Sequence, residues 1–402
     1  MKFILWKWQD NKWRSRYNAE HVSIVADMIR RNYKGQCEIY CCTDDAEGLR
    51  DDIIPVPLPM KAAHLGHCYR RLELFAPEYA KIIGGKFVSV DLDAVITGDL
   101  TEIIDNSPDF AIVKDYQGEQ PYNGSFWIHQ PGTRPQVWQN FYGSEQAVIK
   151  QGDKLGFTAC DQKVMATILG VNERVYGVEE GFVSYKLCIR NKGNLLPFNA
   201  KFVAFHGNPK PEDCLHIDWV AKHYRKSKRA IVLGGADCVW DDLASLGNLA
   251  DTADIIAVND SGYAYEGKIK YWVSLHPEKF KIWEPMRAAK TKETNYIKIG
   301  YAKADKDNRQ KLSDEYTQNW CDAQGVELSG SSGLFAAKIA LEKGYDEIIL
   351  CGVPMDSRVN IHRGKAWTQF NVYQDAWAVF KDKLLGKVRS QSGWTKELLG
   401  CV

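Results

Sequence analysis

Short apolar runs alternate with longer amphipathic stretches through the first half of the chain. We expect strands at residues 3–6, 37–42 and 87–90, and the helical pattern over 19–31 predicts a helix. The stretch 69–79 is a second long amphipathic segment. Alternation of this kind favours an α/β sheet with crossover helices.

The second half of the chain begins with the same alternation. The pattern predicts strands at 231–233, 255–258 and 347–351 and a helix over 333–343, with a glycine turn after the first strand. Before it, a basic stretch at 223–229 interrupts the apolar pattern. The 402 residues, 45% of them hydrophobic, are enough for two cores. We therefore predict two α/β domains, at residues 1–222 and 228–402, the second Rossmann-like.

Charge changes this picture little. The net charge is +1, with 27 Lys and Arg against 28 Asp and Glu before residue 226 and 25 against 23 from there on. Neither half is a basic module of the kind that binds nucleic acid by charge alone. A local patch at Lys381, Lys383, Lys387 and Arg389 is the best candidate for such binding, but a solvated helix face is the favoured explanation.

No stretch of the sequence approaches the roughly 18 apolar residues of a membrane helix, and the first apolar run is too short for a signal peptide. We expect a soluble, cytoplasmic protein without membrane insertion, in the host cytoplasm if the chain is phage-encoded. The 11 cysteines are scattered through apolar segments, so we expect reduced core thiols. The adjacent Cys41 and Cys42 have no spaced Cys/His partners, and we expect no zinc site there.

Two carboxylates follow the predicted strand at 87–90. Asp91 and Asp93 are separated by one residue, and ligands of open α/β sheets lie beyond the carboxyl ends of strands. A divalent cation bound to a pyrophosphate takes oxygen ligands of this type. By itself the Asp-x-Asp spacing is common, and a strand-end turn with solvated carboxylates explains it as well.

Four elements in order give residues 1–220 a resemblance to the retaining family 8 glycosyltransferases and their bacterial and phage relatives, which have a GT-A fold. The first is the Asp-x-Asp itself. The others are an Asn-Gly element in Pro121-Tyr-Asn-Gly-Ser-Phe-Trp-Ile, an Asp-Gln pair in Ala159-Cys-Asp-Gln-Lys, and Phe205-His-Gly-Asn-Pro-Lys-Pro. The last departs from the family, because Glu212 and Asp213 follow where a tryptophan is expected. The identity of the acceptor therefore cannot be carried over from the family to this chain.

The resemblance implies a metal site of Asp91, Asp93 and His206, a set of carboxylates and imidazole suited to Mn²⁺ or to Mg²⁺. Gly207 would let the backbone approach the diphosphate of a UDP-sugar donor, and Lys210 would stabilise the departing phosphate. A histidine satisfied within the core is the alternative for His206.

The same resemblance gives roles to six further residues. Asn123, Asp161 and Gln162 would bind the donor sugar or brace its reactive carbon, although Asn123-Gly124 is also a hairpin signal. Thr43, Asp44 and Arg71 would contact the nucleotide. A helix cap explains Thr43 and Asp44 equally well, and a surface charge explains Arg71.

In the second half, the segment from Ser329 to Asp356 weakly resembles the Rossmann-like group that includes family 42 sialyltransferases and phage proteins of unknown role. Its loop of small residues would present N–H groups and hydroxyls to an anion. The resemblance implies that His362 is a base for an acceptor hydroxyl. It also implies a nucleotide pocket lined by Gly234, Gly235, Asn259, Ser331, Ser332 and Gly333. The sialyltransferase turn Gly-Asn-Gly-Pro-Ser is missing, and an inactive, acceptor-positioning domain is an equal alternative.

These observations predict a metal-dependent glycosyltransferase that moves a sugar from a UDP-sugar to an acceptor hydroxyl with retention of configuration. It would be bifunctional if the second domain is a transferase too. A surface glycan and a modified base in phage DNA are both candidate acceptors. The alternative from another class is a nucleotide-sugar or glycan-binding protein without turnover, which keeps the fold and lacks the chemistry.

Overall fold

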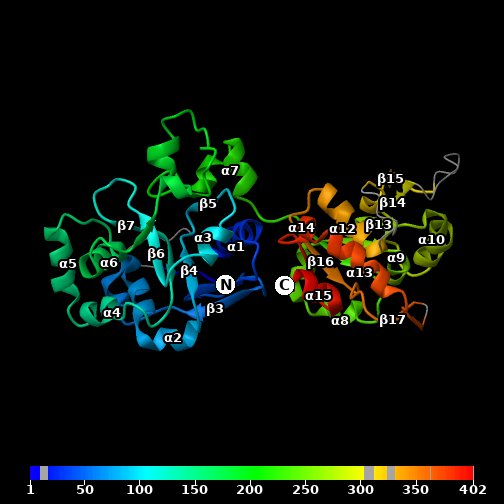
Figure 1. The fold of residues 1–402 in the computed structure, drawn as a ribbon, viewed down its shortest axis with the longest axis horizontal. Coiled ribbons are helices and arrows are strands. Elements are labelled where there is room, and N and C mark those ends of the chain that lie inside the picture. Colours follow the sequence, from blue (N-terminus) through cyan, green and yellow to red (C-terminus); the bar gives the residue numbers. More distant parts are fainter. Residues whose placement is uncertain (10–16, 303–311, 324–330, 363, 402) are drawn as a thin grey trace. The chain divides into compact units, whose positions relative to one another are not determined.

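The computed structural model describes residues 1–9, 17–302, 312–323, 331–362 and 364–401. The chain divides into two compact units, Met1–Lys226 (unit 1) and Ser227–Val402 (unit 2). The predicted α/β class is confirmed, because each unit contains a seven-stranded sheet with parallel strands and covering helices (Figure 1). Within the described residues, no helix has both the length and the apolar character needed to cross a bilayer.

The main sheet of unit 1 has the strand order β3-β2-β1-β4-β7-β6-β8. Strands β3, β2, β1 and β4 are parallel, whereas β7 is antiparallel to both of its neighbours. The strands are β1 (Lys2–Lys7), β2 (Glu38–Thr43), β3 (Ile53–Pro57), β4 (Phe87–Val90), β6 (Phe110–Lys114), β7 (Tyr122–His129) and β8 (Arg174–Tyr176).

Both faces of this sheet are buried. Alternate residues of β1 point to opposite sides, Phe3 and Leu5 to one core and Ile4 and Trp6 to the other. The first core packs against α1 (Ala19–Asn32), whose first turn is capped by the Asn18 side chain. The second packs against the 3₁₀ segment η2 (His67–Phe75), α2 (Pro77–Ile83), α4 (Gln136–Phe141), α5 (Glu145–Lys154) and α6 (Asp161–Leu169).

A small second sheet in unit 1 has the order β5-β10-β9, from β5 (Ala94–Ile96), β10 (Phe202–Ala204) and β9 (Phe182–Ser184). Strand β5 pairs antiparallel with β10, with Ala94 opposite Ala204. The next backbone bond, from Phe205 N–H to the Asp93 carbonyl at 2.9 Å, extends the pairing. This register places the segment after β10 beside the Asp-x-Asp. The short helices α3 (Thr101–Asp105) and α7 (Asp218–His223) complete the unit.

Unit 2 has an all-parallel sheet with the order β15-β14-β13-β12-β11-β16-β19. The order runs outward in both directions from the adjacent β11 and β16, which is the doubly wound arrangement with its switch point between them. The strands are β11 (Arg229–Leu233), β12 (Asp254–Val258), β13 (Tyr271–Ser274), β14 (Ile297–Tyr301), β15 (Glu315–Thr317), β16 (Glu347–Cys351) and β19 (Val388–Ser390).

Helices cover both faces of this second sheet (Figure 1). One face packs on α12 (Ser332–Glu342), α13 (Phe370–Val379), α14 (Lys381–Leu384) and α15 (Gly393–Leu399). The other packs on α8 (Val239–Ala244) and α10 (Phe280–Ala288), with α9 (Ser261–Ala264) nearby. Unit 2 also contains the short helix α11 (Trp320–Ala323) and a hairpin of β17 (Val359–Asn360) and β18 (Lys365–Ala366).

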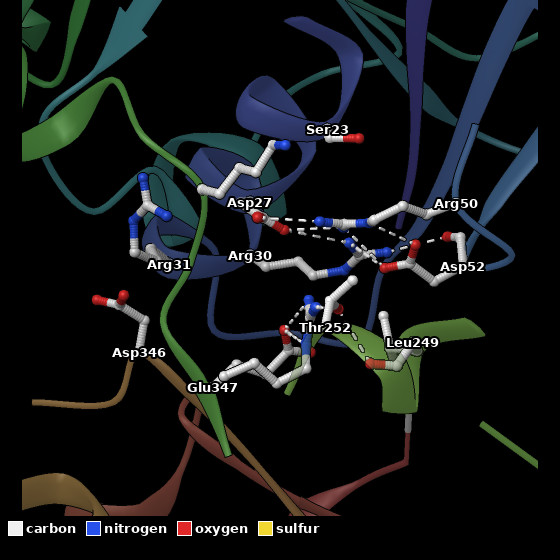
Figure 2. Close-up of polar contacts among 12 residues, drawn as sticks. Ser23, Asp27, Arg30, Arg31, Arg50, Asp52, Leu249, Thr252, Asp346 and Glu347 are labelled. Carbon is white, nitrogen blue, oxygen red and sulfur yellow. Dashed lines mark hydrogen bonds and ion pairs between the residues drawn. The ribbon is translucent and has the colours of Figure 1, made fainter. Parts of the chain in front are cut away.

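Figure 2 shows a buried network of charges in unit 1. Both terminal nitrogens of Arg50 donate to the carboxylate of Asp27, at 2.8 and 3.0 Å, and Arg50 also donates to both oxygens of Asp52 at 2.9 Å. Arg30 pairs with Asp52 at 2.7 Å. Because Asp27 is 1% exposed, removing one partner would leave an uncompensated buried charge. The network therefore fastens α1 to the loop before β3.

His129, at the end of β7, lies fully buried among aromatic rings, with Phe75 at 4.5 Å between ring centroids. Neither of its ring nitrogens has a hydrogen-bond partner among the described residues. Burial lowers the pKa of His129 to about 3. The folded state therefore does not bind a proton that the unfolded chain accepts at about pH 6.5.

This difference predicts a pH-dependent stability. Above about pH 6.5, His129 does not make the free energy of unfolding depend on pH. As the pH falls from there toward 3, the free energy of unfolding decreases, because only the unfolded chain then gains a proton at this histidine. We expect His129→Leu to remove this slope, so that between pH 6 and pH 5 the variant gains about 1 kcal/mol of unfolding free energy over the wild type. Urea unfolding at both pH values measures it. The exposed His64→Leu is the control, and an equal gain there would contradict the explanation.

Candidate functional site

Asp91 and Asp93 lie in the connection between β4 and β5 of unit 1. The Asp91 N–H donates to the Ser125 carbonyl on β7 at 2.9 Å, so the sheet fixes the backbone of the first carboxylate. Burial raises the pKa of Asp91 to about 6, and the neighbouring Asp93 and Asp161 act in the same direction against the guanidinium of Arg71. The two side chains are 29% and 19% exposed. Both carboxylates thus remain accessible from a cavity.

His206 follows β10, and the small sheet brings it to the same place. Its Nε2 is 2.7 Å from the Oγ of Ser184, and its ring stacks on Tyr116 with the planes 7° apart. Burial lowers the pKa of His206, with Lys186 acting in the same direction, which favours the neutral imidazole. A neutral imidazole held at one nitrogen is the form in which histidine binds metals.

Asp91, Asp93 and His206 line one cavity of about 240 Å³. It opens where β4 and β7 of the main sheet meet the end of β10. The wall is predominantly polar and combines carboxylates, amides, a phenol and an imidazole. Its residues are Asp91, Asp93, Asp115, Tyr116, Gln117, Gln120, Asn123, Ser125, Thr158, Ala159, Gln162, Ala204 and His206.

Lys210 forms an ion pair with the carboxylate of Asp93 and also donates to the Phe205 carbonyl at 3.3 Å. Its ammonium thus provides a positive charge directly beside this carboxylate. Gly207 has φ of 74°, and no atom lies within 4 Å of the position that a Cβ would take. The left-handed backbone favours glycine there, and the space beside it is open to a ligand.

Arg71 is buried behind the cavity and is not part of its wall. Its guanidinium donates to Asp161 Oδ2 from Nε at 2.7 Å, to the Gly124 carbonyl at 3.2 Å and to Asp91. The residue expected to contact a nucleotide therefore connects η2, α6 and β7 to the first carboxylate. We propose that Arg71 positions Asp91 rather than touching the nucleotide.

Two of the predicted sugar-binding residues are in the wall of the cavity. The Oδ1 of Asn123 accepts from the Ser125 N–H at 3.0 Å, and the Oε1 of Gln162 accepts from the Gly124 N–H at 2.8 Å. Each side chain therefore keeps its amide NH₂ for other partners. Asp161, in contrast, is 3% exposed and is neutralised by Arg71. Asp161 therefore lies behind the cavity wall, where it holds Arg71.

Gly124 is the point where β7 passes closest to Arg71. A Cβ at this position would lie 2.7 Å from the Arg71 guanidinium, which is held by two carboxylates. We expect Gly124→Ala to displace Arg71 and to lower the unfolding free energy by about 1–3 kcal/mol, with a matching loss of ligand binding. Thermal and urea unfolding measure the effect. In the control Gly177→Ala, the nearest atom would be at 3.9 Å, and equal destabilisation there would contradict the steric explanation.

Thr43 and Asp44 lie at the carboxyl end of β2. The Thr43 Oγ1 donates to the Asp45 carbonyl at 2.7 Å, and Asp44 accepts from the Gln9 N–H at 3.0 Å. A second hollow, of about 350 Å³, is next to them, but neither residue is part of its wall. Its wall consists of Lys7, Gln9, Tyr17, Asn18, Ala19, Glu20, Asp45 and Glu47.

The side chains of Asp91, Asp93 and His206 are of types that bind a divalent cation. In this structure, however, their ligand atoms are too far apart to bind one ion together. Their ligand atoms do not all lie within 4.8 Å of one another. Among the described residues, one other set of potential metal ligands does lie within this distance. Lys210 and Arg71 hold the two carboxylates instead. Binding a cation would require Asp93 to turn from Lys210 to the ion.

The glycine turn predicted to bind a nucleotide in unit 2 follows β11 at the switch point of the sheet. The N–H groups of Gly234 and Ala236 donate to the carbonyls of Cys351 and Gly352, at 2.8 and 3.1 Å. A Cβ at Gly234 would lie 2.2 Å from the Gly352 carbonyl oxygen, and one at Gly235 would lie 2.8 Å from Asn360. Close packing accounts for both glycines, and the N–H groups of Gly234 and Ala236 donate to the protein.

The other residues predicted for unit 2 also have internal partners. Asn259, with φ of 51°, accepts from the Ser274 hydroxyl at 2.8 Å. Ser331 caps α12 through the Leu334 N–H at 3.2 Å, Ser332 is the first residue of that helix, and Gly333 packs on Val353. The ring of His362 lies beside Tyr263, 5.7 Å between centroids. Ser329 and Gly330 of the predicted loop lie outside the described residues.

Sequence reasoning missed several residues of the site. Ser184 and Tyr116, which hold the imidazole, and Asp115 in the cavity wall come from separate segments with no motif of their own. The pairing of β9 with β10 brings Ser184 beside His206.

No protein-family model matches the chain. No curated protein sequence matches it either. Among solved structures, it is similar to the glycosyltransferase GlyE of Streptococcus pneumoniae TIGR4, at 11% identity over 81% of this chain and 97% of that one, with a TM-score of 0.36. The apo form of GlyE gives 13% identity over 86% and 99%, with a TM-score of 0.37. An active-site mutant of LgtC gives 13% over 52% and 89%, with a TM-score of 0.35. At TM-scores of this size, we draw neither fold nor function from the likeness.

Proposed function

We propose that unit 1 is a GT-A glycosyltransferase that moves a sugar from a UDP-sugar to an acceptor hydroxyl with retention of configuration. One observation carries the proposal: two carboxylates at the end of β4 and a neutral imidazole after β10 line the same cavity with the amides of Asn123 and Gln162. This set combines ligands for a divalent cation with hydrogen-bonding groups for a sugar.

In this proposal, Asp91, Asp93 and His206 hold Mn²⁺ or Mg²⁺. The ion supplies positive charge to the diphosphate as the glycosidic bond breaks. In the tautomer that this proposal requires, His206 would donate its Nε2–H to Ser184, 2.7 Å away, and Nδ1 would present its lone pair. Lys210, released from Asp93, places its ammonium on a phosphate oxygen, and Gly207 provides the space for that group.

The donor sugar would lie against the amides of Asn123 and Gln162, whose oxygens are already occupied by backbone N–H groups. Their NH₂ groups then face sugar hydroxyls as donors. The hollow beside β1 and β2 is the place where we would look for the nucleoside, because ligands of α/β sheets bind beyond the carboxyl ends of strands. Thr43 and Asp44 lie next to this hollow and are not part of its wall.

The acceptor in this proposal is a hydroxyl of a surface glycan or of a modified base in phage DNA. The near-neutral charge of both halves favours the glycan. Unit 2 would position the acceptor rather than bind a donor phosphate, because the N–H groups of Gly234 and Ala236 in its predicted phosphate-binding turn donate to carbonyls of the protein. Retention of the chain on modified duplex that weakens with salt would favour the DNA base instead.

The proposal is tested by incubating the full chain with UDP-, GDP- and CMP-sugars and Mn²⁺ and following donor hydrolysis by mass spectrometry. We expect slow release of UDP from one UDP-sugar, and a rise in melting temperature with the same donor. A melting shift without hydrolysis, with any donor or acceptor offered, would favour the alternative of a binding protein without turnover. Neither response with any donor would contradict both.

A further inference from the structure

Two cysteines far apart in the sequence meet beside the Arg71–Asp161 ion pair. Cys68 lies in η2, and Cys160 is the residue before α6, so the packing of η2 against α6 joins them. Together with Asp161, they offer two sulfur atoms and one carboxylate oxygen that all lie within 4.8 Å of one another. Among the described residues, this is the one such set of potential metal ligands.

We propose that Cys68, Cys160 and Asp161 bind a thiophilic divalent cation of the zinc type. Two thiolates beside a carboxylate suit Zn²⁺ and Cd²⁺, whereas Mg²⁺ and Mn²⁺ prefer sites made of oxygen ligands. Zinc bonds of about 2.0–2.3 Å in a tetrahedron separate the ligand atoms by roughly 3.5–3.8 Å, so small side-chain movements close the present arrangement.

The surroundings of the three residues suit this role. Arg71 directs both of its bonds at Oδ2 of Asp161, and so takes only one of the two carboxylate oxygens. Both cysteines are partly exposed, which leaves an approach for the ion.

Binding involves no redox step. The divalent cation forms two bonds to sulfur and one to a carboxylate oxygen of Asp161, which pairs with Arg71. Each thiol releases its proton to the solvent. Three protein ligands leave a fourth tetrahedral position for water. The site shares no ligand with Asp91, Asp93 and His206, although Arg71 joins Asp161 to Asp91. It does not rest on the proposed transfer reaction.

The test uses Cd²⁺ alone as the probe on the reduced full-length chain. We expect one equivalent to produce the ultraviolet charge-transfer absorption of thiolate bound to cadmium. Cys68→Ser and Cys160→Ser should each lose most of this absorption, whereas Cys37→Ser and Cys188→Ser, at partly exposed cysteines outside the set, should keep it. Asp93→Asn should keep it too. Retention in both variants of the set, or no absorption in the wild type, would overturn the proposal.

A second measurement needs no variant and so does not depend on any substitution folding. One equivalent of Cd²⁺ should protect Cys68 and Cys160 from alkylation, as read by peptide mass mapping, and leave the labelling of Cys37 and Cys188 unchanged. Excess Mn²⁺ should not remove the protection, because it competes poorly for thiolates. Protection that falls on other cysteines, or that is absent, would overturn the assignment.

Discussion

Replacing Asp93 by asparagine is expected to lower the rate of sugar transfer, or of donor hydrolysis, by about 100-fold or more. The substitution keeps the shape of the side chain and removes the charge that pairs with Lys210 and, in the proposed function, with the cation. Losing one electrostatic partner of a reacting group commonly costs about 10²–10³ in rate. Product formation with saturating donor and Mn²⁺ measures the effect.

Asp93→Asn should leave the fold intact, because the side chain is 19% exposed and faces a cavity. Its melting temperature is therefore the first check. Asp99→Asn provides a matched control, since this aspartate follows the same strand pair and bonds to Lys34 at 2.7 Å on the surface. Equal rates for the wild type and Asp93→Asn would refute the role of this carboxylate.

Arg71→Met is expected to lower the free energy of unfolding by about 3–5 kcal/mol. The substitution retains most of the side-chain volume, but it leaves the buried Asp161 carboxylate, at 3% exposure, without its cation. Breaking a buried ion pair from one side is costly for this reason. Asp91 loses a partner at the same time, so that metal-dependent binding should fall as well. Urea unfolding with a coincident fluorescence and circular dichroism transition measures the stability.

The control for Arg71 is Arg174→Met. Arg174 pairs with Glu180 at 2.9 Å, but its side chain is 53% exposed, and such surface pairs contribute about 0–1 kcal/mol. If Arg71→Met lowers the free energy of unfolding no more than Arg174→Met does, the buried contacts of Arg71 with Asp161 and Asp91 do not stabilise the fold. Unchanged stability with lost ligand binding would instead return Arg71 to the direct nucleotide contact expected from the sequence.

Several regular elements of both units follow closely from the pattern of apolar residues. The helix expected over 19–31 extends from Ala19 to Asn32, and the strand at 87–90 has the same bounds in the structure. The strand at 347–351 is likewise unchanged. These segments are predictable because burial on one or both faces imposes a clear period on their sequences. The stretch 69–79 is different, since it forms η2 and the start of α2 with a break at Ala76.

The arrangement around the cavity could not be predicted in the same way. The strands β5, β9 and β10 have three residues each, too few to show a period, although their pairing places His206 beside Asp93. Arg71 was expected to contact the nucleotide, with a surface charge as the alternative. No local pattern distinguishes a buried arginine whose two carboxylate partners come from distant segments.

The two thiols of the further inference illustrate the same limit. Cys68 and Cys160 belong to different elements, and their meeting depends on how η2 packs on α6. In unit 2, the glycines after β11 were correctly placed in a turn at a strand end, but the sequence does not say where their N–H groups are directed. That depends on the neighbouring loop after β16, which supplies the accepting carbonyls.

The central claim is that the carboxylates after β4 bind UDP through a divalent cation. Isothermal titration of the full chain with UDP, in the presence and absence of Mn²⁺, tests it most directly, with Asp93→Ala beside the wild type. We predict measurable binding to the wild type only with Mn²⁺, and a loss of at least about tenfold in affinity in the variant, which corresponds to about 1.4 kcal/mol. Metal-independent binding of UDP that is unaffected by the substitution would contradict the claim.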